Sequence, residues 1–267
     1  MFAEVKNRAG KTNEKSSYIE AAGKASCLLY AQDGCHATFF IRILGPEIFF
    51  TIFDRGGSLS TCGYNIHQFP RTFLRILIGI SCASLSTLGF DKLIRWRQVQ
   101  RDDRVVQVKE VQFVKDGLVY VIELISILFI SDNPHGRGTT VWKGVKMRKK
   151  WRNWGKQNVV VKDSWIDPLR KYTEGKILSI LNDHGIEGVP KLIHEQQIKT
   201  FHPTIPGKTV NSSTHFLRAP LAHRERGSYY LRVLSRIITE PVGDLITEFS
   251  CLGELLVAFL DYVIGKL

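Results

Sequence analysis

The run Val159-Val160-Val161-Lys162, which follows the compact glycine turn Gly136-Arg137-Gly138-Thr139, constrains the fold of this chain most strongly. Three β-branched residues in succession favour a buried strand. A lysine that leaves such a strand is held near the core and needs an anionic partner. Because glycines let a backbone approach phosphate closely, the turn and the lysine together predict a site for a phosphorylated ligand.

Each of these signals also has an ordinary explanation. A Gly-x-Gly sequence is typical of hairpin turns with positive φ, and a lysine at a strand end is often only solvated. The third glycine of a phosphate loop is absent, and Val141 stands at its spacing. Glu174, one predicted helix downstream, is the candidate partner of Lys162, while Lys171 and Lys176 are alternative partners for that glutamate.

The charge of the chain points to an anionic partner. Of 267 residues, 44% are hydrophobic and 23% are charged, as in globular proteins. The formal net charge is +12, and the stretch from Lys143 to Lys176 holds eleven Lys and Arg against three Asp and Glu. Such a local excess favours binding of a nucleotide, a nucleic acid or an acidic protein.

Cysteine usage and hydropathy indicate an intracellular protein, cytoplasmic or nuclear, without a membrane partner. The start of the chain has no apolar signal core, and no run approaches the roughly 18 uninterrupted apolar residues of a membrane span. The cysteines are odd in number and form no Cys-x-x-Cys pair, which favours reduced thiols: Cys27, Cys35, Cys62, Cys82 and Cys251.

The pattern of elements predicts an α+β fold. Residues 1–25 are polar and predict a disordered tail. Residues 26–115 form an N-terminal α/β extension, for which the expected elements are a hairpin of Thr38–Leu44 and Ile48–Phe53, a helix from Phe69 to Leu88, and an edge strand pair between Trp96 and Lys115.

Residues 116–243 are expected to form a lobe made of an antiparallel sheet and one helix. Its predicted strands are Val119–Ile130, Thr139–Val145, Asn158–Lys162, Lys191–His194 and Tyr229–Ile238, with a helix at Asp167–Leu181 and a polar loop at Thr200–Thr214. Residues 244–267 contain a predicted helix, Ser250–Leu267, with Ser250 as N-cap and its leucines toward a core.

Two further segments have compositions that bear on function. Lys146–Trp154 mixes five basic residues with two tryptophans, which fits a solvated hairpin tip, a nuclear-import signal or a nucleic-acid contact. His223–Arg226 is not a kinase catalytic loop, because Glu225 stands in place of the aspartate base and no metal-binding asparagine follows.

Taken in order, these motifs resemble the fungal-type protein kinase family over nearly everything after the predicted tail. The segments that carry the resemblance are Phe53–Gly57, Leu88–Asp91, Gly136–Trp142, Val160–Trp165, Glu174–Leu178, Gly188–Pro190 and Arg232–Gly243.

The resemblance implies a bilobal kinase that uses ATP and magnesium to phosphorylate serine or threonine of proteins. It assigns Gly136, Arg137, Gly138 and Thr139 to the phosphate loop, Lys162 and Glu174 to phosphate positioning, and Thr239, Glu240 and Val242 to the adenine-contacting linker. The family's catalytic His-x-Asp and metal-binding Asp-x-Gly segments would lie beyond Leu267.

Residues 244–267 are therefore expected to begin an incomplete large lobe, and this chain alone is expected to be an inactive fragment. A non-catalytic kinase-like binding module is the main alternative. A basic nucleic-acid-binding protein is a further one, less favoured by the sequence.

Overall fold

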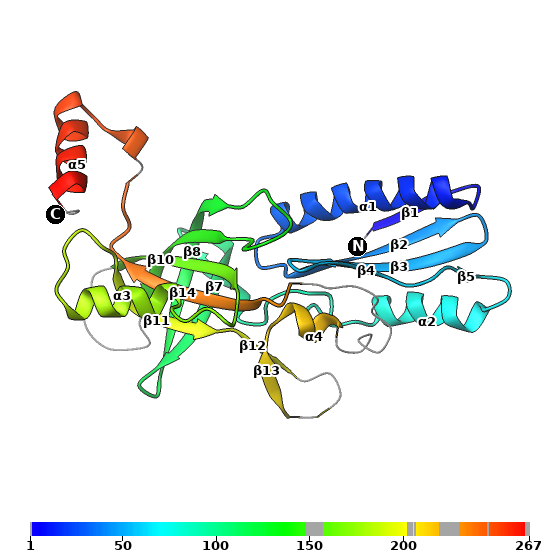
Figure 1. Cartoon of the computed structure of the whole chain (residues 1–267). Helices are drawn as coiled ribbons and strands as arrows, with labels where there is room; N and C mark the ends of the chain where they lie inside the picture. Colours follow the sequence, from blue (N-terminus) through cyan, green and yellow to red (C-terminus); the bar gives the residue numbers. More distant parts are fainter. Residues whose placement is uncertain are drawn as a thin grey trace.

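The computed structural model describes residues 2–147, 157–201, 205, 207–218, 230–244 and 246–264. Two units lie side by side along an elongated molecule (Figure 1). The extension (residues 2–91) holds the N-terminus, and the lobe (residues 94–244) is built on a large antiparallel sheet. The mixed α+β class predicted from the sequence is confirmed.

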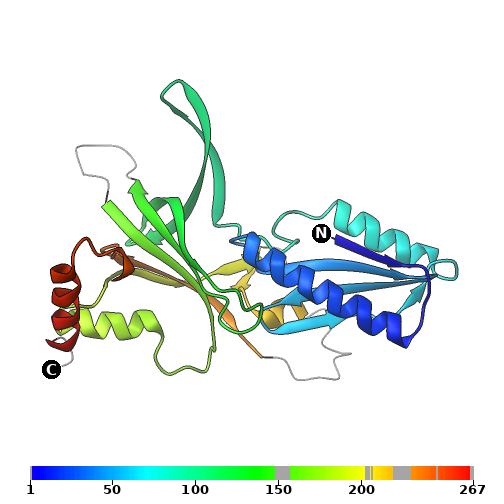
Figure 2. The ribbon, with the colours of Figure 1, turned by 90° about the horizontal axis from the view of Figure 1, so that it is seen from above.

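The extension is a sheet covered by one long helix. Its strands are β1 (Phe2–Lys6), β2 (Ala37–Leu44), β3 (Glu47–Asp54), β4 (Gly57–Ser60) and β5 (Tyr64–Asn65). Strands β1 and β2 are parallel, and the other pairs are antiparallel. Helix α1 (Lys11–Ala31) packs on this sheet, and α2 (Pro70–Ser81) lies beside β5 (Figure 2).

The prediction of a disordered tail over residues 1–25 was wrong, because β1 and α1 occupy those residues. Helix α1 buries small side chains: Ala21 and Ala25 are at most 1% exposed and contact Phe40 and Phe53. A helix that packs through alanine shows little apolar periodicity. The polar composition therefore concealed it.

The lobe is one seven-stranded antiparallel sheet. In spatial order its strands are β11 (Lys191–Gln197), β14 (Val233–Glu240), β10 (Gln157–Ile166), β9 (Thr140–Met147), β8 (Leu118–Ile130), β7 (Arg104–Lys115) and β6 (Ile94–Arg101). The core gathers on one face, around Trp142, Val159 and Val161. Strands β6 and β7 continue this sheet, so the sheet extends across the boundary predicted at residue 115 and begins at Ile94.

Several predicted boundaries also shift. The helix predicted at Asp167–Leu181 is α3 (Glu174–Asp183), since Thr173 caps it and Pro168 disfavours helix in the residue before it. Helix α2 ends at Ser81 rather than Leu88. The predicted polar loop contains a small hairpin of β12 (Lys199–Phe201) and β13 (Thr209–Asn211), followed by α4 (Thr214–Arg218).

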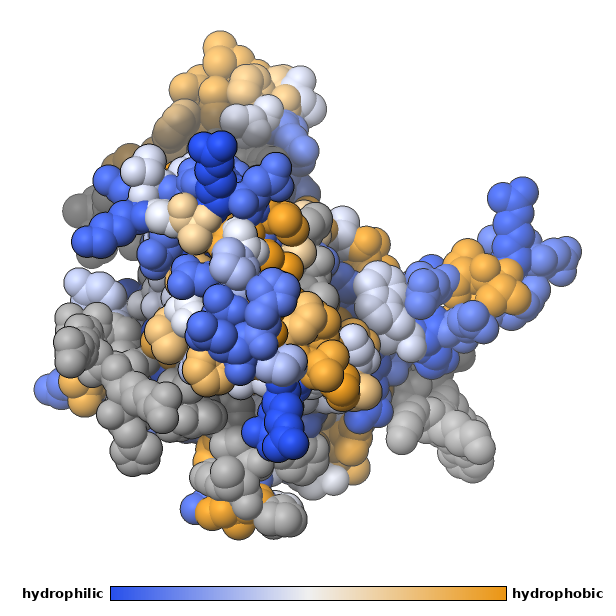
Figure 3. Space-filling model, turned by 90° about the vertical axis from the view of Figure 1, so that its right-hand side faces the viewer, coloured by the Kyte–Doolittle hydropathy of each residue, from blue (hydrophilic) through white to orange (hydrophobic). Residues whose placement is uncertain are grey.

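The last helix is more exposed than the sequence predicts. After a short 3-10 helix (Ile246–Glu248), α5 (Leu252–Ile264) stands away from the sheet, and its apolar side chains were expected to face a core. Leu252 is 66% exposed and Leu260 57% exposed instead, and Figure 3 shows this apolar helix clear at the top of the molecule. Ser250 is not an acceptor cap, because its hydroxyl and amide donate to Glu254.

Candidate nucleotide-binding site

Lys162 lies on β10, the strand between β9 and β14. Successive side chains of a strand point to opposite faces. Val161 is fully buried in the core face, so Lys162 points to the other face, where its side chain is 27% exposed. The valine run therefore holds Lys162 at the edge of the core, as its sequence predicts, with the lysine side chain on the open face of the strand.

Glu174 meets this lysine from α3. Lys162 Nζ donates to Glu174 Oε1 at 2.6 Å and to Oε2 at 2.8 Å. Glu174 is the first residue of the helix, where a carboxylate is favoured by the helix dipole. The alternative partners are engaged elsewhere, since Lys171 and Lys176 both lie over the ring of Tyr172.

The next residue, Gly175, lets α3 approach β11. A Cβ at this position would lie 2.4 Å from Glu195 Cδ. Glu195 in turn accepts a hydrogen bond from Thr173, whose hydroxyl oxygen also accepts from the Lys176 amide. The sequence Thr173-Glu174-Gly175 thus holds the start of the helix against the sheet with Glu174 directed at Lys162.

The loop of residues 131–139 joins β8 to β9 and ends in the glycine turn (residues 136–139). Gly136 has φ of 89° and Gly138 has φ of 45°, both in the region that favours glycine. The Arg137 carbonyl accepts from the Trp165 amide at 2.7 Å, which holds the turn along β10. The Arg137 side chain lies 3.5 Å from Glu174.

The predicted adenine linker begins at the end of β14. Thr239 pairs with Val160 of β10 on one side, so this end of β14 is adjacent to the strand that carries Lys162. Glu240 pairs with Lys191 of β11 on the other side, and its carboxylate accepts from Gln157. Val242 follows outside the sheet, half-buried.

Sequence reasoning missed the polar contacts that join the extension to the lobe. A buried triad consists of Arg236 with two carboxylates: Arg236 Nε donates to Asp163 at 2.7 Å, and Nη2 donates to Asp163 and Asp91 at 2.6 Å each. Asp91 belongs to the extension and Asp163 follows Lys162. No local pattern pairs residues 145 positions apart, as Asp91 and Arg236 are.

Charges in this triad shift each other's protonation. Burial, together with the neighbouring Asp91 charge, raises the pKa of the Asp163 carboxyl although Arg236 acts to lower it. For Asp91, burial acts upward, but Arg236 and His36 outweigh it and lower the pKa. Burial also lowers the pKa of the His36 imidazole, whose ring meets Trp165 edge-on at 5.5 Å.

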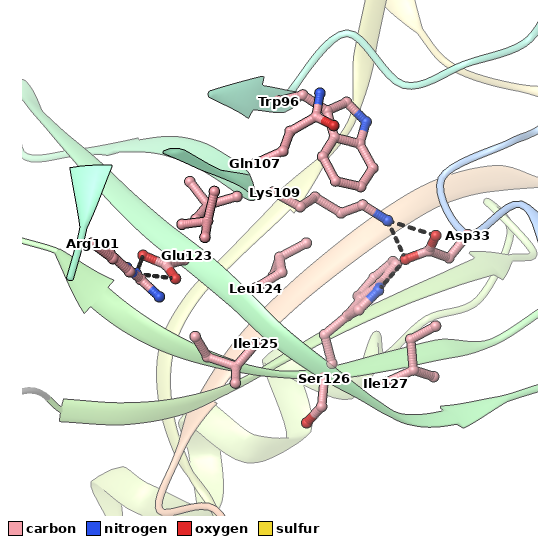
Figure 4. Close-up of a pocket in the computed structure, with 13 residues that line it drawn as sticks. Asp33, Trp96, Arg101, Gln107, Lys109, Glu123, Leu124, Ile125, Ser126 and Ile127 are labelled. Atoms are coloured by element: carbon pink, nitrogen blue, oxygen red, sulfur yellow. Dashed lines mark hydrogen bonds and ion pairs between the residues drawn. The ribbon is translucent and has the colours of Figure 1, made fainter. Parts of the chain in front are cut away.

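A cavity of about 540 Å³ lies on the face of the sheet opposite Lys162. Asp33 of the extension reaches this cavity and accepts hydrogen bonds from Lys109 and from the Trp142 indole at 2.6 and 2.7 Å (Figure 4). Arg101 pairs with Glu123 at its other end. Its charges are therefore paired, and it does not include the residues predicted for the nucleotide.

Two absences apply to the part of the chain that the structure describes. It holds no group of three or more His, Cys, Asp or Glu side chains arranged to bind a metal ion. Within the same residues, no helix has both the length and the apolar content needed to cross a bilayer.

A strand lysine paired with a helix glutamate beside a glycine turn, on an antiparallel sheet, defines a lobe of protein-kinase type. The comparison with family models agrees with this class. The chain belongs to the family described as "Fungal protein kinase", whose model matches residues 1–267. No curated protein and no solved structure matches the chain.

Proposed function

We propose that the lobe binds ATP on the Lys162 face of its sheet, as the nucleotide half of a protein kinase. The observation that carries this proposal is the ion pair between Lys162 and Glu174, at 2.6 and 2.8 Å, on the open face of β10. Glu174 is proposed to hold the ammonium group in place, and Lys162 to contact the α- and β-phosphates. Backbone groups from Thr239 to Val242 are proposed to meet the adenine.

The glycine turn fits phosphate by its backbone. Among the described residues, the amides of Arg137 and Gly138 donate to no protein group. Free backbone amides in a turn are suited to anion binding. Arg137, close to Glu174, adds a cation at the same place. When bound, ATP supplies the phosphoryl group for transfer, and Gly136–Thr139 cover it.

Phosphorylation of serine or threonine in a protein substrate is the further part of this proposal, inferred from the family. The described residues do not offer a cluster that fits magnesium, so no step is assigned to that ion. The sequence contains no His-x-Asp segment. We therefore propose that these 267 residues alone bind nucleotide without transferring phosphate at a useful rate.

The test is nucleotide binding by wild type and by Lys162→Met, measured by isothermal titration with ATP. The expected result is a loss of about tenfold in affinity, the size of one hydrogen bond to a charged group. Lys6→Met is the matched control, since Lys6 pairs with Glu20 at 2.6 Å with 23% of its side chain exposed, far along the extension.

Two outcomes would end this proposal. Wild type that does not bind ATP at millimolar concentration has no nucleotide site of the proposed kind. Equal losses in the Lys162 and Lys6 variants would assign the effect to stability or net charge. A folded chain that binds a protein but no nucleotide would favour the binding-module alternative.

The nucleic-acid alternative depends on Lys146–Trp154, most of which lies outside the described residues. A steep loss of affinity with salt that disappears on neutralising Arg148, Lys149 and Lys150 would favour it. An intracellular location, cytoplasmic or nuclear, is also part of the proposal. It is supported by the free thiols of all five cysteines.

A further inference from the structure

Arg55 of the extension reaches the glycine turn of the lobe. It follows β3 at the end of the extension that faces the lobe, and it is 4% exposed. Its Nη1 donates to the carbonyl oxygen of Asn133 at 3.0 Å and to that of Pro134 at 3.4 Å. Its own carbonyl accepts from the amide of Gly136 at 3.2 Å. Arg55 therefore contacts the loop at Asn133 and Pro134 and the glycine turn at Gly136.

The same guanidinium is fixed from behind by α1. Arg55 Nη2 donates to the carbonyl of Leu29, in the last turn of that helix, and Figure 2 shows the loop between β8 and β9 reaching the end of α1. Within the described residues no carboxylate pairs with Arg55, so carbonyl oxygens alone hold its charge. A positive charge beneath the turn also favours an anion bound on it.

Gly138 is the residue that makes this contact possible. A Cβ at position 138 would lie 2.4 Å from Arg55 Nε and 2.6 Å from Cζ. Gly136, in contrast, would have no atom within 4 Å of an added Cβ. The second glycine of the turn is thus required by the extension as well as by its φ.

We infer that Arg55 is a positioning residue for the nucleotide phosphates. It holds the glycine turn in the conformation that presents the free amides of Arg137 and Gly138. The turn lacks a third glycine, and Val141 stands at that spacing. Its shape is imposed from outside, by Arg55 on one side and by the Trp165 amide on the other. This inference rests on the proposed ATP site and adds to it a function for the extension.

The experiment separates phosphate binding from nucleoside binding. Dissociation constants of ATP and of adenosine are measured by ligand-observed NMR for wild type and Arg55→Met. The dissociation constant of adenosine divided by that of ATP is the ratio that reports the phosphate contribution. It should fall about tenfold in the variant, as for one lost hydrogen bond to a charged group, while adenosine affinity stays within about twofold.

Arg42→Met is the matched control. Arg42 is also a buried arginine of the extension, 2% exposed, and it donates to Ser17 and Ser60 rather than to the loop. Its replacement should weaken the extension and leave the ratio unchanged. If both variants lower the ratio equally, Arg55 has only a structural role and the inference is wrong.

The remaining outcomes separate the inference from the proposed function. A wild-type ratio near one would refute the ATP site itself. A normal ratio in folded Arg55→Met would refute only the positioning role. If Arg55→Met does not fold, Arg55→Lys and amide exchange decide: the Gly136 amide should exchange faster and the ratio should fall in that variant, and no change in either refutes the inference.

Discussion

Replacing Arg236 by methionine should destabilise the chain strongly. The guanidinium is fully buried and donates hydrogen bonds both to Asp163 of the lobe and to Asp91 of the extension. Removing one partner of a buried ion pair costs about 3–5 kcal/mol, because the remaining charge stays desolvated. For a chain of this size that corresponds to a fall in melting temperature of about 10 °C.

The pH dependence of this deficit tests the reasoning more sharply than its size. Without Arg236, burial should raise the pKa of both carboxyls in the folded state. A group with a raised folded pKa binds protons more readily when folded, so stability increases as the pH falls through that pKa. The deficit of Arg236→Met against wild type, measured by urea unfolding, should therefore shrink between pH 7.5 and pH 5.

Asp91→Asn provides the comparison. It leaves Arg236 and Asp163 as a one-to-one pair, and the asparagine oxygen can still accept from the Leu93 amide, as Asp91 does at 2.8 Å. The expected cost is about 1.5–3 kcal/mol, that of a hydrogen bond to a charged group. A deficit for Arg236→Met that is no larger than this, or that is independent of pH, would refute the argument.

Two smaller effects are expected, one at His36 beside the triad and one at Gly175 on α3. Burial lowers the pKa of His36 in the folded chain below the ordinary imidazole value of about 6.5. The unfolded chain therefore binds a proton on His36 more readily, and the stability of wild type should decrease as the pH falls from 7.5 to 5. His36→Gln should flatten this slope in urea unfolding, and an unchanged slope would exclude His36 as its source. Gly175→Ala should destabilise by about 1–3 kcal/mol because its Cβ meets Glu195, whereas Gly79→Ala, in open space on α2, should stabilise by about 1 kcal/mol. Thermal unfolding measures both, and a gain at position 175 would contradict the steric argument.

The pairing of β10 with the helix that follows it could be anticipated in part, because its signals are local. A valine run sets the face of Lys162, and Thr173 starts a helix soon after it that places Glu174 opposite the lysine. Strand alternation and a helix soon after the strand therefore made Glu174 a candidate partner of Lys162. The choice against Lys171 and Lys176, and the start of the helix after Thr173, came only from the structure. The hairpin of β2 and β3 was predictable for the same reason, since Gly45 and Pro46 separate two β-rich runs.

The contacts between the extension and the lobe could not be predicted, because the residues that make them are remote in sequence. Asp33 and the Trp142 indole are 109 positions apart, and Arg55 and Asn133 are 78 apart. Periodicity and propensity carry no information about such pairs. Helix α1 was not predicted for another reason. It packs through small residues and polar groups rather than through an apolar stripe.

Two adjacent residues of β10 link the proposed nucleotide site to the extension. Lys162 faces the proposed nucleotide, and Asp163, on the opposite face, binds Arg236 and through it Asp91 of the extension. Because strand alternation is fixed, a shift of β10 that loosened the triad would also move Lys162. Arg55 makes a corresponding link to the glycine turn. The extension therefore contacts both structural supports of the proposed phosphate site, which is the physical reason to treat the extension and the lobe together.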